Sequence, residues 1–362
     1  MPLVAYQRAH GSNDFPLHFA FFEAMEARGM LDRITFALDP MLDATYCAKL
    51  MLRFPQLVLT ETACISRRAM RFLSEYIGRA YRPLAFLGTF DAVCEAPGGR
   101  INPHYSTRSL FHFYPRTRRR AILFHSIEAA AMQNSAVSES VGSCDLVIAR
   151  TKESARLADK AGAKQVIEAA DIVFRTQVHQ PIYKPGLAVA LRVPAYNPPE
   201  EFIERTRCIL NDLESLGRPI DHTRTEEPIG AEMIARGYGT DGQPRIGLYG
   251  DDAMYVPFQA KRDLVISARL HTTLLAILYG NRHVLQYQIE QGTNKIAEIW
   301  SDLGLHALRV LPPDEVTRER VNEFISNPTA LPEDQVQTAL TKAREKVENG
   351  LDAVEEWLCR VK

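Results

Sequence analysis

The chain has 362 residues, of which 46% are apolar and 24% charged, and its 43 basic and 44 acidic residues leave a formal net charge of −1. This length exceeds what one hydrophobic core usually organises, so we expect two domains of ordinary globular composition. The near-zero charge excludes a global positive field that would attract a nucleic acid, and no nucleic-acid partner is expected.

Short β-rich runs alternate with helical stretches from the start of the chain. The expected strands are PLVAY, ITFAL, LVLT, DAVCEA, RAILFHS, DLVIA and QVIEA, and the expected helices cover 16–28, 42–53, 66–81 and 152–161. Such alternation predicts a parallel sheet with helices on its faces. The segment TQVHQPIYKPG has two prolines, a glycine and no periodic pattern, so the N-terminal domain, which we take as residues 1–178, ends there.

The second half repeats this pattern. The expected strands are LAVALR, PRIGLYG, DLVISA and HVLQYQ, and the expected helices cover 198–216, 226–236, 294–303, 316–326 and 332–360. We therefore predict an α/β fold of two Rossmann-like, doubly wound domains that face one another across a cleft. The second domain spans 187–330, and a long amphipathic C-terminal helix within 331–362 packs back on the protein.

The six cysteines (Cys47, Cys64, Cys94, Cys144, Cys208 and Cys359) are scattered and show no CxxC pair or metal-ligand spacing. We expect reduced thiols, no metal and no cofactor. The start MPLVAYQRAHGSND has too short an apolar run for a signal peptide, and no segment reaches the roughly 20 apolar residues of a membrane span. We expect a cytoplasmic protein, and local arginines offer a route to peripheral contact with the inner face of the membrane.

The stretch DLVISARLHTTLLAILYG places an arginine and a histidine between a strand and a helix. Because the carboxyl end of a parallel strand opens onto the binding crevice, Arg269 and His271 are expected at that crevice. The helix is expected to begin near Thr272, so the free N–H groups of its first turn would stabilise an anion there. In the alternative interpretation, Arg269 pairs with a surface carboxylate, His271 is a capping or core residue, and Thr272 or Thr273 caps the helix.

These residues resemble a signature of the polysaccharide pyruvyl transferases, in which a strand, Arg-Leu-His and an apolar helix ending in glycine follow one another. Here that is ISARLHTTLLAILYG, followed by LQYQIEQGTNKIAEIWSDLGL with Tyr287 and Lys295. Upstream, DLVIARTKESARLADKAGA resembles the family's strand that ends in an arginine and is followed by an acidic residue, a serine and a helix, and these residues are here Arg150, Glu153 and Ser154. EAADIVF resembles the segment with the family's aspartate after the next strand, which is here Asp171. DAVCEAPGG resembles the family's glycine-ended strand, whose glycines are here Gly98 and Gly99. The N-terminus departs from the family, because HGSNDFPLHFAFF keeps Gly11, Asn13 and Asp14 without a doubled glycine.

The resemblance implies a GT-B-like enzyme that moves the pyruvyl group of phosphoenolpyruvate onto a sugar or glycan acceptor, free or lipid-linked, as a pyruvate ketal. The donor is a carboxylate and a phosphate, so it needs cationic groups and a helix N-terminus. The implied substrate-binding set is Arg269, Arg150, Lys295, Gly98, Gly99, Thr272 and Tyr287. The reaction also needs one acid and one base. We assign His271 as the acid and Asp14 as the base, with Glu95 and Asp171 as alternatives to Asp14.

Two alternatives remain open. A GT-B-like glycosyltransferase would use the same helix terminus to hold the diphosphate of a nucleotide sugar. A non-catalytic protein that binds anions or nucleic acid would use two groups of arginines, which we otherwise interpret as solvated surface. These groups are Arg67, Arg68, Arg71, Arg79 and Arg82, and Arg116, Arg118, Arg119 and Arg120.

Overall fold

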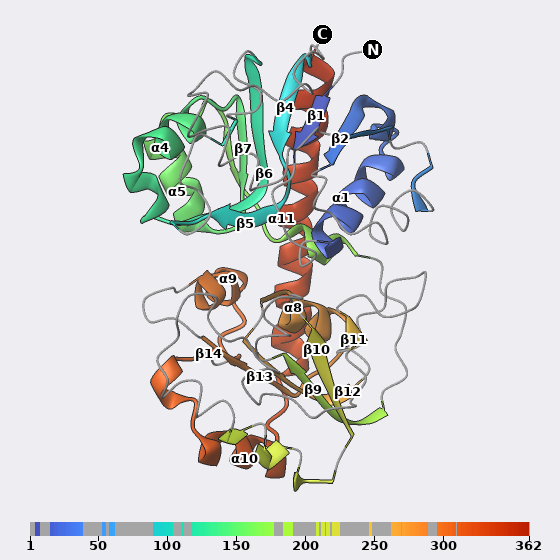
Figure 1. Cartoon of the computed structure of the whole chain (residues 1–362), viewed down its shortest axis with the longest axis vertical. Helices are drawn as coiled ribbons and strands as arrows, with labels where there is room; N and C mark the ends of the chain where they lie inside the picture. Colours follow the sequence, from blue (N-terminus) through green and yellow to red (C-terminus); the bar gives the residue numbers. More distant parts are fainter. Residues whose placement is uncertain are drawn as a thin grey trace, which may run out of the picture. The chain divides into compact units, whose positions relative to one another are not determined.

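The computed structural model describes residues 4–7, 15–38, 53–55, 58–61, 90–103, 110–111, 117–176, 184–190, 208–209, 211–213, 215–217, 219–224, 246–247, 262–268, 270–288, 295–308 and 310–361. The chain divides into two compact units (Figure 1). The first contains Met1–Arg175 and Arg344–Lys362, and the second contains Thr176–Ala343. The expected helices over 42–53, 66–81, 198–216 and 226–236 lie wholly or largely outside the described residues.

The first unit contains an eight-stranded parallel sheet among its described residues, which confirms the predicted sheet. Its strand order is β3-β2-β1-β4-β6-β7-β8, with β5 beside β6. The strands are β1 (Val4–Gln7), β2 (Ile34–Leu38), β3 (Val58–Glu61), β4 (Ala92–Glu95), β5 (Gly98–Ile101), β6 (Arg119–Ile127), β7 (Leu146–Ala149) and β8 (Val166–Glu168). The helices of this unit whose bounds the structure describes are α1 (Phe15–Ala27), α4 (Ser135–Gly142) and α5 (Lys152–Lys160), with short 3-10 turns η2 (Leu31–Arg33), η5 (Ala131–Gln133) and η6 (Ile172–Arg175).

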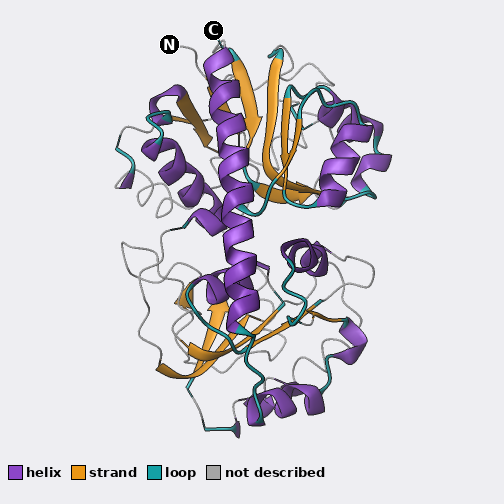
Figure 2. Ribbon diagram, turned by 180° about the vertical axis from the view of Figure 1, so that it is seen from behind, coloured by secondary structure: helices purple, strands orange, loops and turns teal. Residues whose placement is uncertain are grey.

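Successive residues of the central strands point to opposite faces of this sheet, and both faces are covered. Val93, Ile122 and Val147 face α4 and α5, whose apolar residues share one buried cluster with them. The neighbouring residue Ile148 faces the other way, toward the C-terminal helix α11 (Glu333–Arg360). Figures 1 and 2 show this helix along one face of the sheet. Burial on both faces explains why these strands read as unbroken apolar runs.

Two elements of the first unit were missed in the sequence. Strand β5 begins at Gly98, where the pattern predicted only a glycine-ended turn, and it extends the sheet beside the carboxyl end of β6. Helix α4 has the polar sequence SAVSESVG, and the side chain of Asn134 caps it by accepting a hydrogen bond from the Ala136 N–H at 3.0 Å. Its apolar positions are too few to give a clear helical period.

The second unit contains a six-stranded parallel sheet among its described residues, in the order β11-β10-β9-β12-β13-β14. The strands are β9 (Lys184–Ala190), β10 (Ile220–Arg224), β11 (Ile246–Gly247), β12 (Arg262–Ser267), β13 (Val284–Tyr287) and β14 (Val310–Leu311). The helices of this unit alone whose bounds the structure describes are α8 (Leu270–Leu278), α9 (Lys295–Leu303) and α10 (Arg318–Ser326), with the 3-10 turn η8 (Pro313–Glu315). Strands β10 and β14 were not predicted.

One face of the second sheet carries an apolar cluster that includes Leu264, Ile266 and residues of α10. Helix α8 packs against β12 and β13 without contributing to that cluster, so it covers the opposite face. The N-terminal part of α11 is tied to this unit, because Arg282 pairs with Glu333 through two contacts of 2.7 and 3.0 Å. Hydrogen bonds from Arg282 and Gln337 lower the pKa of Glu333 to about 2.

Helix α11 spans 28 residues, and its apolar stripe is buried as predicted. Its residues 333–343 belong to the second unit and 344–360 to the first. The opposite side of the helix is charged. No helix in the described part of the chain is long and apolar enough to cross a membrane.

Four cysteines lie among the described residues, and all four are free thiols. Cys94 and Cys144 are buried, and burial raises the pKa of both thiols well above its ordinary value. The thiolate forms of both residues are therefore disfavoured. Cys359 is exposed and Cys208 is half-buried.

A glycine allows α11 to approach the sheet of the first unit closely. A Cβ atom on Gly350 would lie 2.9 Å from Cε1 of Phe124 and 3.0 Å from Cγ2 of Ile148. Phe124 has a positive φ of 46° at a register shift in β6, so its backbone holds the ring in place. The contact therefore requires a residue without a side chain.

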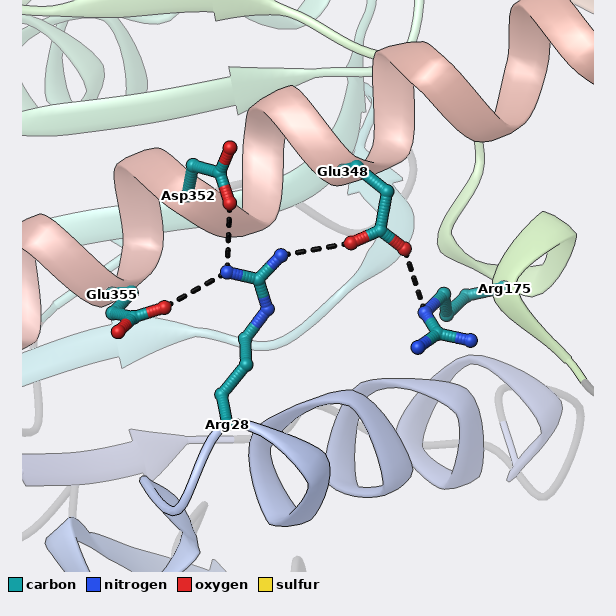
Figure 3. A network of polar contacts seen from close by, with 5 residues as sticks. All are labelled: Arg28, Arg175, Glu348, Asp352 and Glu355. Atoms are coloured by element: carbon teal, nitrogen blue, oxygen red, sulfur yellow. Dashed lines mark hydrogen bonds and ion pairs between the residues drawn. The ribbon is translucent and has the colours of Figure 1, made fainter.

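Charged side chains add a second tie between α11 and the first unit (Figure 3). Arg28 donates hydrogen bonds to Glu348, Asp352 and Glu355 at 2.7–2.8 Å, and Arg175 pairs with Glu348 at 2.7 Å. Burial lowers the pKa of Arg28, but the three hydrogen bonds outweigh this effect and raise it above its ordinary value. The three carboxylates lie on one side of the helix, so a single guanidinium bridges two of its turns.

Replacing Gly350 with alanine should destabilise the protein. Alanine favours a helix interior by about 1 kcal/mol over glycine, but overpacking against Phe124 costs about 1–3 kcal/mol, so we expect a net loss of about 1 kcal/mol. Urea unfolding measures the difference. The matched control is Asn349→Ala, at the exposed neighbouring position of α11, which should leave stability unchanged or slightly raised. A gain in stability in Gly350→Ala as large as that in the control would contradict the close contact between α11 and Phe124.

Replacing Arg28 with glutamine should lower the free energy of unfolding by about 1–2 kcal/mol at low salt, because three neighbouring carboxylates lose their shared cation. The loss should shrink at high salt, which screens the remaining repulsion. Thermal unfolding at two salt concentrations tests this. Arg360→Gln removes a guanidinium that pairs with Glu356 alone in an exposed i,i+4 contact, and serves as the control. A loss in Arg28→Gln that is insensitive to salt would mean that packing is responsible.

Candidate functional site

The second unit has a reversal of strand order between β9 and β12. The chain runs outward from β9 through β10 to β11, and then from β12 through β13 to β14 on the other side. Renumbered within the sheet, this is the order 3-2-1-4-5-6 of dinucleotide-binding domains. Ligands of such sheets bind outside the carboxyl ends of the strands at this reversal. Here these ends are Ala190 and Ser267, which are direct partners in the ladder.

Local contacts hold the start of β12 in place. At its start, Asp263 accepts a hydrogen bond from the Gly186 N–H of β9 at 2.7 Å. Gly186 has a φ of 141°, and a Cβ atom there would lie 2.5 Å from the carbonyl oxygen of Pro219, so only glycine fits. Past α8, the amide of Asn281 donates to the carbonyl of Arg262 at 2.5 Å. These contacts hold the start of β12 beside β9 and tie it to Asn281, which precedes β13.

Helix α8 begins at Leu270, two residues before the predicted start. The expectation that Thr272 caps the helix is therefore wrong, because it is the third helical residue. His271 is the second helical residue and is half-buried, so it belongs to the first turn, whose backbone N–H groups have no partner within the helix. Arg269, in the turn between β12 and α8, lies outside the described residues.

Beneath this first turn lie polar residues that the sequence did not single out. Ser267 and Gln286 alternate with the apolar residues of β12 and β13, so they face α8, and both are fully buried. The Gln286 amide donates to the Ser267 carbonyl at 3.3 Å. The signal was present in DLVISA and HVLQYQ, where Ser267 and Gln286 each stand between two apolar residues.

Two other predicted residues of this unit lie near β13. Tyr287 belongs to the apolar cluster on the face opposite α8 and is only 3% exposed, so its ring is a core element. Lys295 is the first residue of α9, and its side chain lies outside the described residues. The structure thus brings His271 and Thr272 together at the strand ends and does not bring the ring of Tyr287 to the same face of the sheet.

The first unit has its own reversal of strand order, between β1 and β4. Glu95 ends β4 there and is buried, with 2% of its surface exposed. The carbonyl of Gly99 accepts a hydrogen bond from the Asn102 side chain at 2.9 Å, and Gly98 pairs with His125. The predicted glycine pair is therefore part of the sheet. Asp14, the predicted base, lies outside the described residues.

Arg150 and Asp171, predicted separately as a substrate ligand and a candidate base, form an ion pair with each other. Arg150 follows β7 and donates to the Asp171 carboxylate at 2.5 Å, and both side chains are almost completely buried. Two further guanidinium N–H groups donate to the hydroxyl of Ser126 at 2.8 and 3.0 Å. The other oxygen of Asp171 accepts from the Val173 N–H at 3.1 Å. This arrangement gives the pair a structural role in joining the ends of β6, β7 and β8.

The described residues contain no group of three or more histidine, cysteine, aspartate or glutamate side chains that could hold a metal ion.

No family model and no curated protein matches the sequence. Solved structures do match its fold. A UDP-GlcNAc 2-epimerase from Neisseria meningitidis bound to UDP-GlcNAc is 11% identical with a TM-score of 0.62, and the match covers 99% of this chain and 100% of that one. The S. aureus MnaA–UDP co-structure is 12% identical (TM-score 0.56, 99% and 97% covered). An α,α-trehalose 6-phosphate synthase from Burkholderia multivorans is 8% identical (TM-score 0.52, 99% and 98% covered).

At these identities the likeness shows the fold alone. The chain has the GT-B type of architecture, with two Rossmann-like units and a C-terminal helix, as the sequence predicted. None of the three similar structures is a pyruvyl transferase.

The structural role of the Arg150–Asp171 pair is testable. Asp171→Ala should lower the free energy of unfolding by about 3–5 kcal/mol, because it leaves a buried guanidinium without its partner. The double variant Arg150→Met/Asp171→Leu should recover much of that loss, because apolar residues of similar size need no partner. Urea unfolding of both variants gives the comparison. A loss below 1 kcal/mol in Asp171→Ala would show that the pair is not buried.

Proposed function

We propose that this chain is a glycosyltransferase that takes a sugar from a nucleotide-sugar donor, and that its second unit binds the diphosphate of the donor at the first turn of α8. The observation that carries the proposal is the reversal of strand order at β9 and β12, with α8 starting three residues after β12 ends. An open parallel sheet binds its ligand at this position, and the helix terminus favours an anion.

The similar structures support a nucleotide sugar as the ligand. Their names include UDP-GlcNAc for one and UDP for another. A structure described as a glycotransferase of kitacinnamycin, 13% identical with a TM-score of 0.50, has the same fold. Fold alone does not determine chemistry, so ligand binding must be measured.

The proposed reaction has a defined requirement for charge stabilisation. The bond between the anomeric carbon of the sugar and the diphosphate breaks, and the nucleoside diphosphate leaves with the electron pair. A hydroxyl of the acceptor forms a bond to the same carbon and loses its proton to a base. The N–H groups of α8, with Arg269 and His271, would stabilise the charge that develops on the leaving diphosphate. Asp14 remains our proposal for the base, and the acceptor is a sugar or glycan, free or lipid-linked.

A second candidate is transfer of a pyruvyl group from phosphoenolpyruvate. It is favoured by one observation, the resemblance of ISARLHTTLLAILYG to the signature of the polysaccharide pyruvyl transferases. In that case Arg269 and the first turn of α8 would bind the phosphate and carboxylate of the donor, and His271 would protonate the methylene carbon of its enol phosphate. Both candidates place an anion at the same turn, so they differ in the donor.

Isothermal titration with UDP, UDP-GlcNAc and phosphoenolpyruvate separates the two candidates. We expect binding of UDP and UDP-GlcNAc, and a loss of about tenfold or more in affinity in Arg269→Ala and in His271→Ala, because hydrogen bonds to charged groups contribute about 1.5–3 kcal/mol. Arg320→Ala and His306→Ala make the same chemical changes at exposed positions of this unit and should bind normally. Binding of phosphoenolpyruvate without binding of either nucleotide would reject the glycosyltransferase in favour of pyruvyl transfer.

A further inference from the structure

Two buried polar atoms beneath the first turn of α8 have no hydrogen-bond partner among the described residues. They are Oγ1 of Thr272 and Oε1 of Gln286, and both side chains are 0% exposed. Leaving such an atom unsatisfied costs about 1–3 kcal/mol. Buried polar groups in folded proteins are normally satisfied, so this pair requires an explanation.

The two atoms belong to one side of the sheet and to one end of it. Thr272 lies in the first turn of α8, and α8 covers the face on which Gln286 lies. The Gln286 amide nitrogen donates to the carbonyl of Ser267, the last residue of β12. Thr272 therefore lies just beyond the carboxyl end of β12, and Gln286 lies beside that end on the neighbouring strand β13.

The hydrogen-bonding types of the two atoms restrict the group that could satisfy them. Because the Gln286 nitrogen is held by a carbonyl, its oxygen is the atom left over, and an amide oxygen only accepts. The hydroxyl of Thr272 can donate as well as accept. A partner must therefore supply a hydrogen to Gln286, and it can accept one from Thr272. A hydroxyl group does both, whereas an ionised phosphate or carboxylate offers only acceptors.

The geometry points to a hydroxyl subsite formed by Thr272 and Gln286, next to the proposed anion site and resting on the proposed function. A hydroxyl of the nucleotide sugar, from its ribose or from its sugar, donates to Oε1 of Gln286 and accepts from Oγ1 of Thr272. Neither ionised group of phosphoenolpyruvate can satisfy Gln286. The pair therefore selects a hydroxyl-bearing donor over a small dianion.

The test uses Thr272→Val and Gln286→Met, which replace the two polar groups with apolar ones of similar size. In the ligand-free protein both variants should melt at the same temperature as the wild type or higher, because an unsatisfied polar atom is removed. Titration should show that UDP-GlcNAc binds about 5- to 10-fold more weakly to each variant, as expected for the loss of one hydrogen bond. Thr273→Val is the matched control, because Thr273 is equally buried but has a partner, and its ligand-free protein should melt lower.

The UDP arm identifies the source of the hydroxyl. If the variants bind both UDP and UDP-GlcNAc more weakly than the wild type, the hydroxyl belongs to the ribose. If they bind only UDP-GlcNAc more weakly, the hydroxyl belongs to the sugar. Unchanged affinity for both nucleotides in both variants, with wild-type binding intact, would overturn the subsite and leave the proposed function standing. So would a fall in melting temperature as large as that of Thr273→Val, which would mean that an internal water already satisfies the pair.

If the wild type binds neither UDP nor UDP-GlcNAc, the proposed function fails. In that case unchanged or raised melting temperatures in both ligand-free variants still support two unsatisfied atoms that await a hydroxyl, and lowered ones reject them.

Discussion

The burial of both faces of two parallel sheets is the constraint on which this structure depends. Strands covered on each side must be apolar, because a polar side chain inside them loses its water and needs a partner. Chemistry is therefore confined to the carboxyl ends of the strands and to the turns that follow. The same constraint makes buried polar residues informative, and Ser267 and Gln286 are two such residues near the carboxyl ends of β12 and β13.

The two units use the ends of their strands differently. In the first, the end of β7 is closed, because Arg150 is neutralised by Asp171 and held by Ser126 in a buried network. In the second, the end of β12 leads to a helix whose first turn carries a half-buried histidine. A buried and fully paired cation stabilises a fold but cannot bind a ligand without losing its partner. The strand ends of the second unit are thus the better candidate for an anion site.

The sequence predicted the parts of this fold that depend on local pattern. Periodicity predicted the strand in DLVISA, the apolar helix after it and the buried stripe of α11. Periodicity depends only on residues that are close together in the chain. Strand β5 was missed because its two glycines indicate a turn, although pairing with β6 outweighs that preference. The contact of Arg150 with Asp171 joins residues 21 apart in sequence at neighbouring strand ends, and no local pattern encodes which side chains meet there.

The two candidate functions rest on different kinds of resemblance, one to a short sequence motif and one to a fold, and neither kind identifies the donor substrate. A short motif such as Arg-Leu-His reports the charge of the ligand, because a helix terminus with an arginine and a histidine suits any phosphate. The fold reports only where the ligand lies. The hydrogen-bonding groups beside the anion site are more selective than its charge. The Gln286 amide nitrogen donates to a carbonyl, so its oxygen is left to accept a hydrogen bond, and an ionised phosphate or carboxylate has no hydrogen to donate. In the subsite that we propose, Gln286 therefore requires a ligand that carries a hydroxyl beside its anionic group.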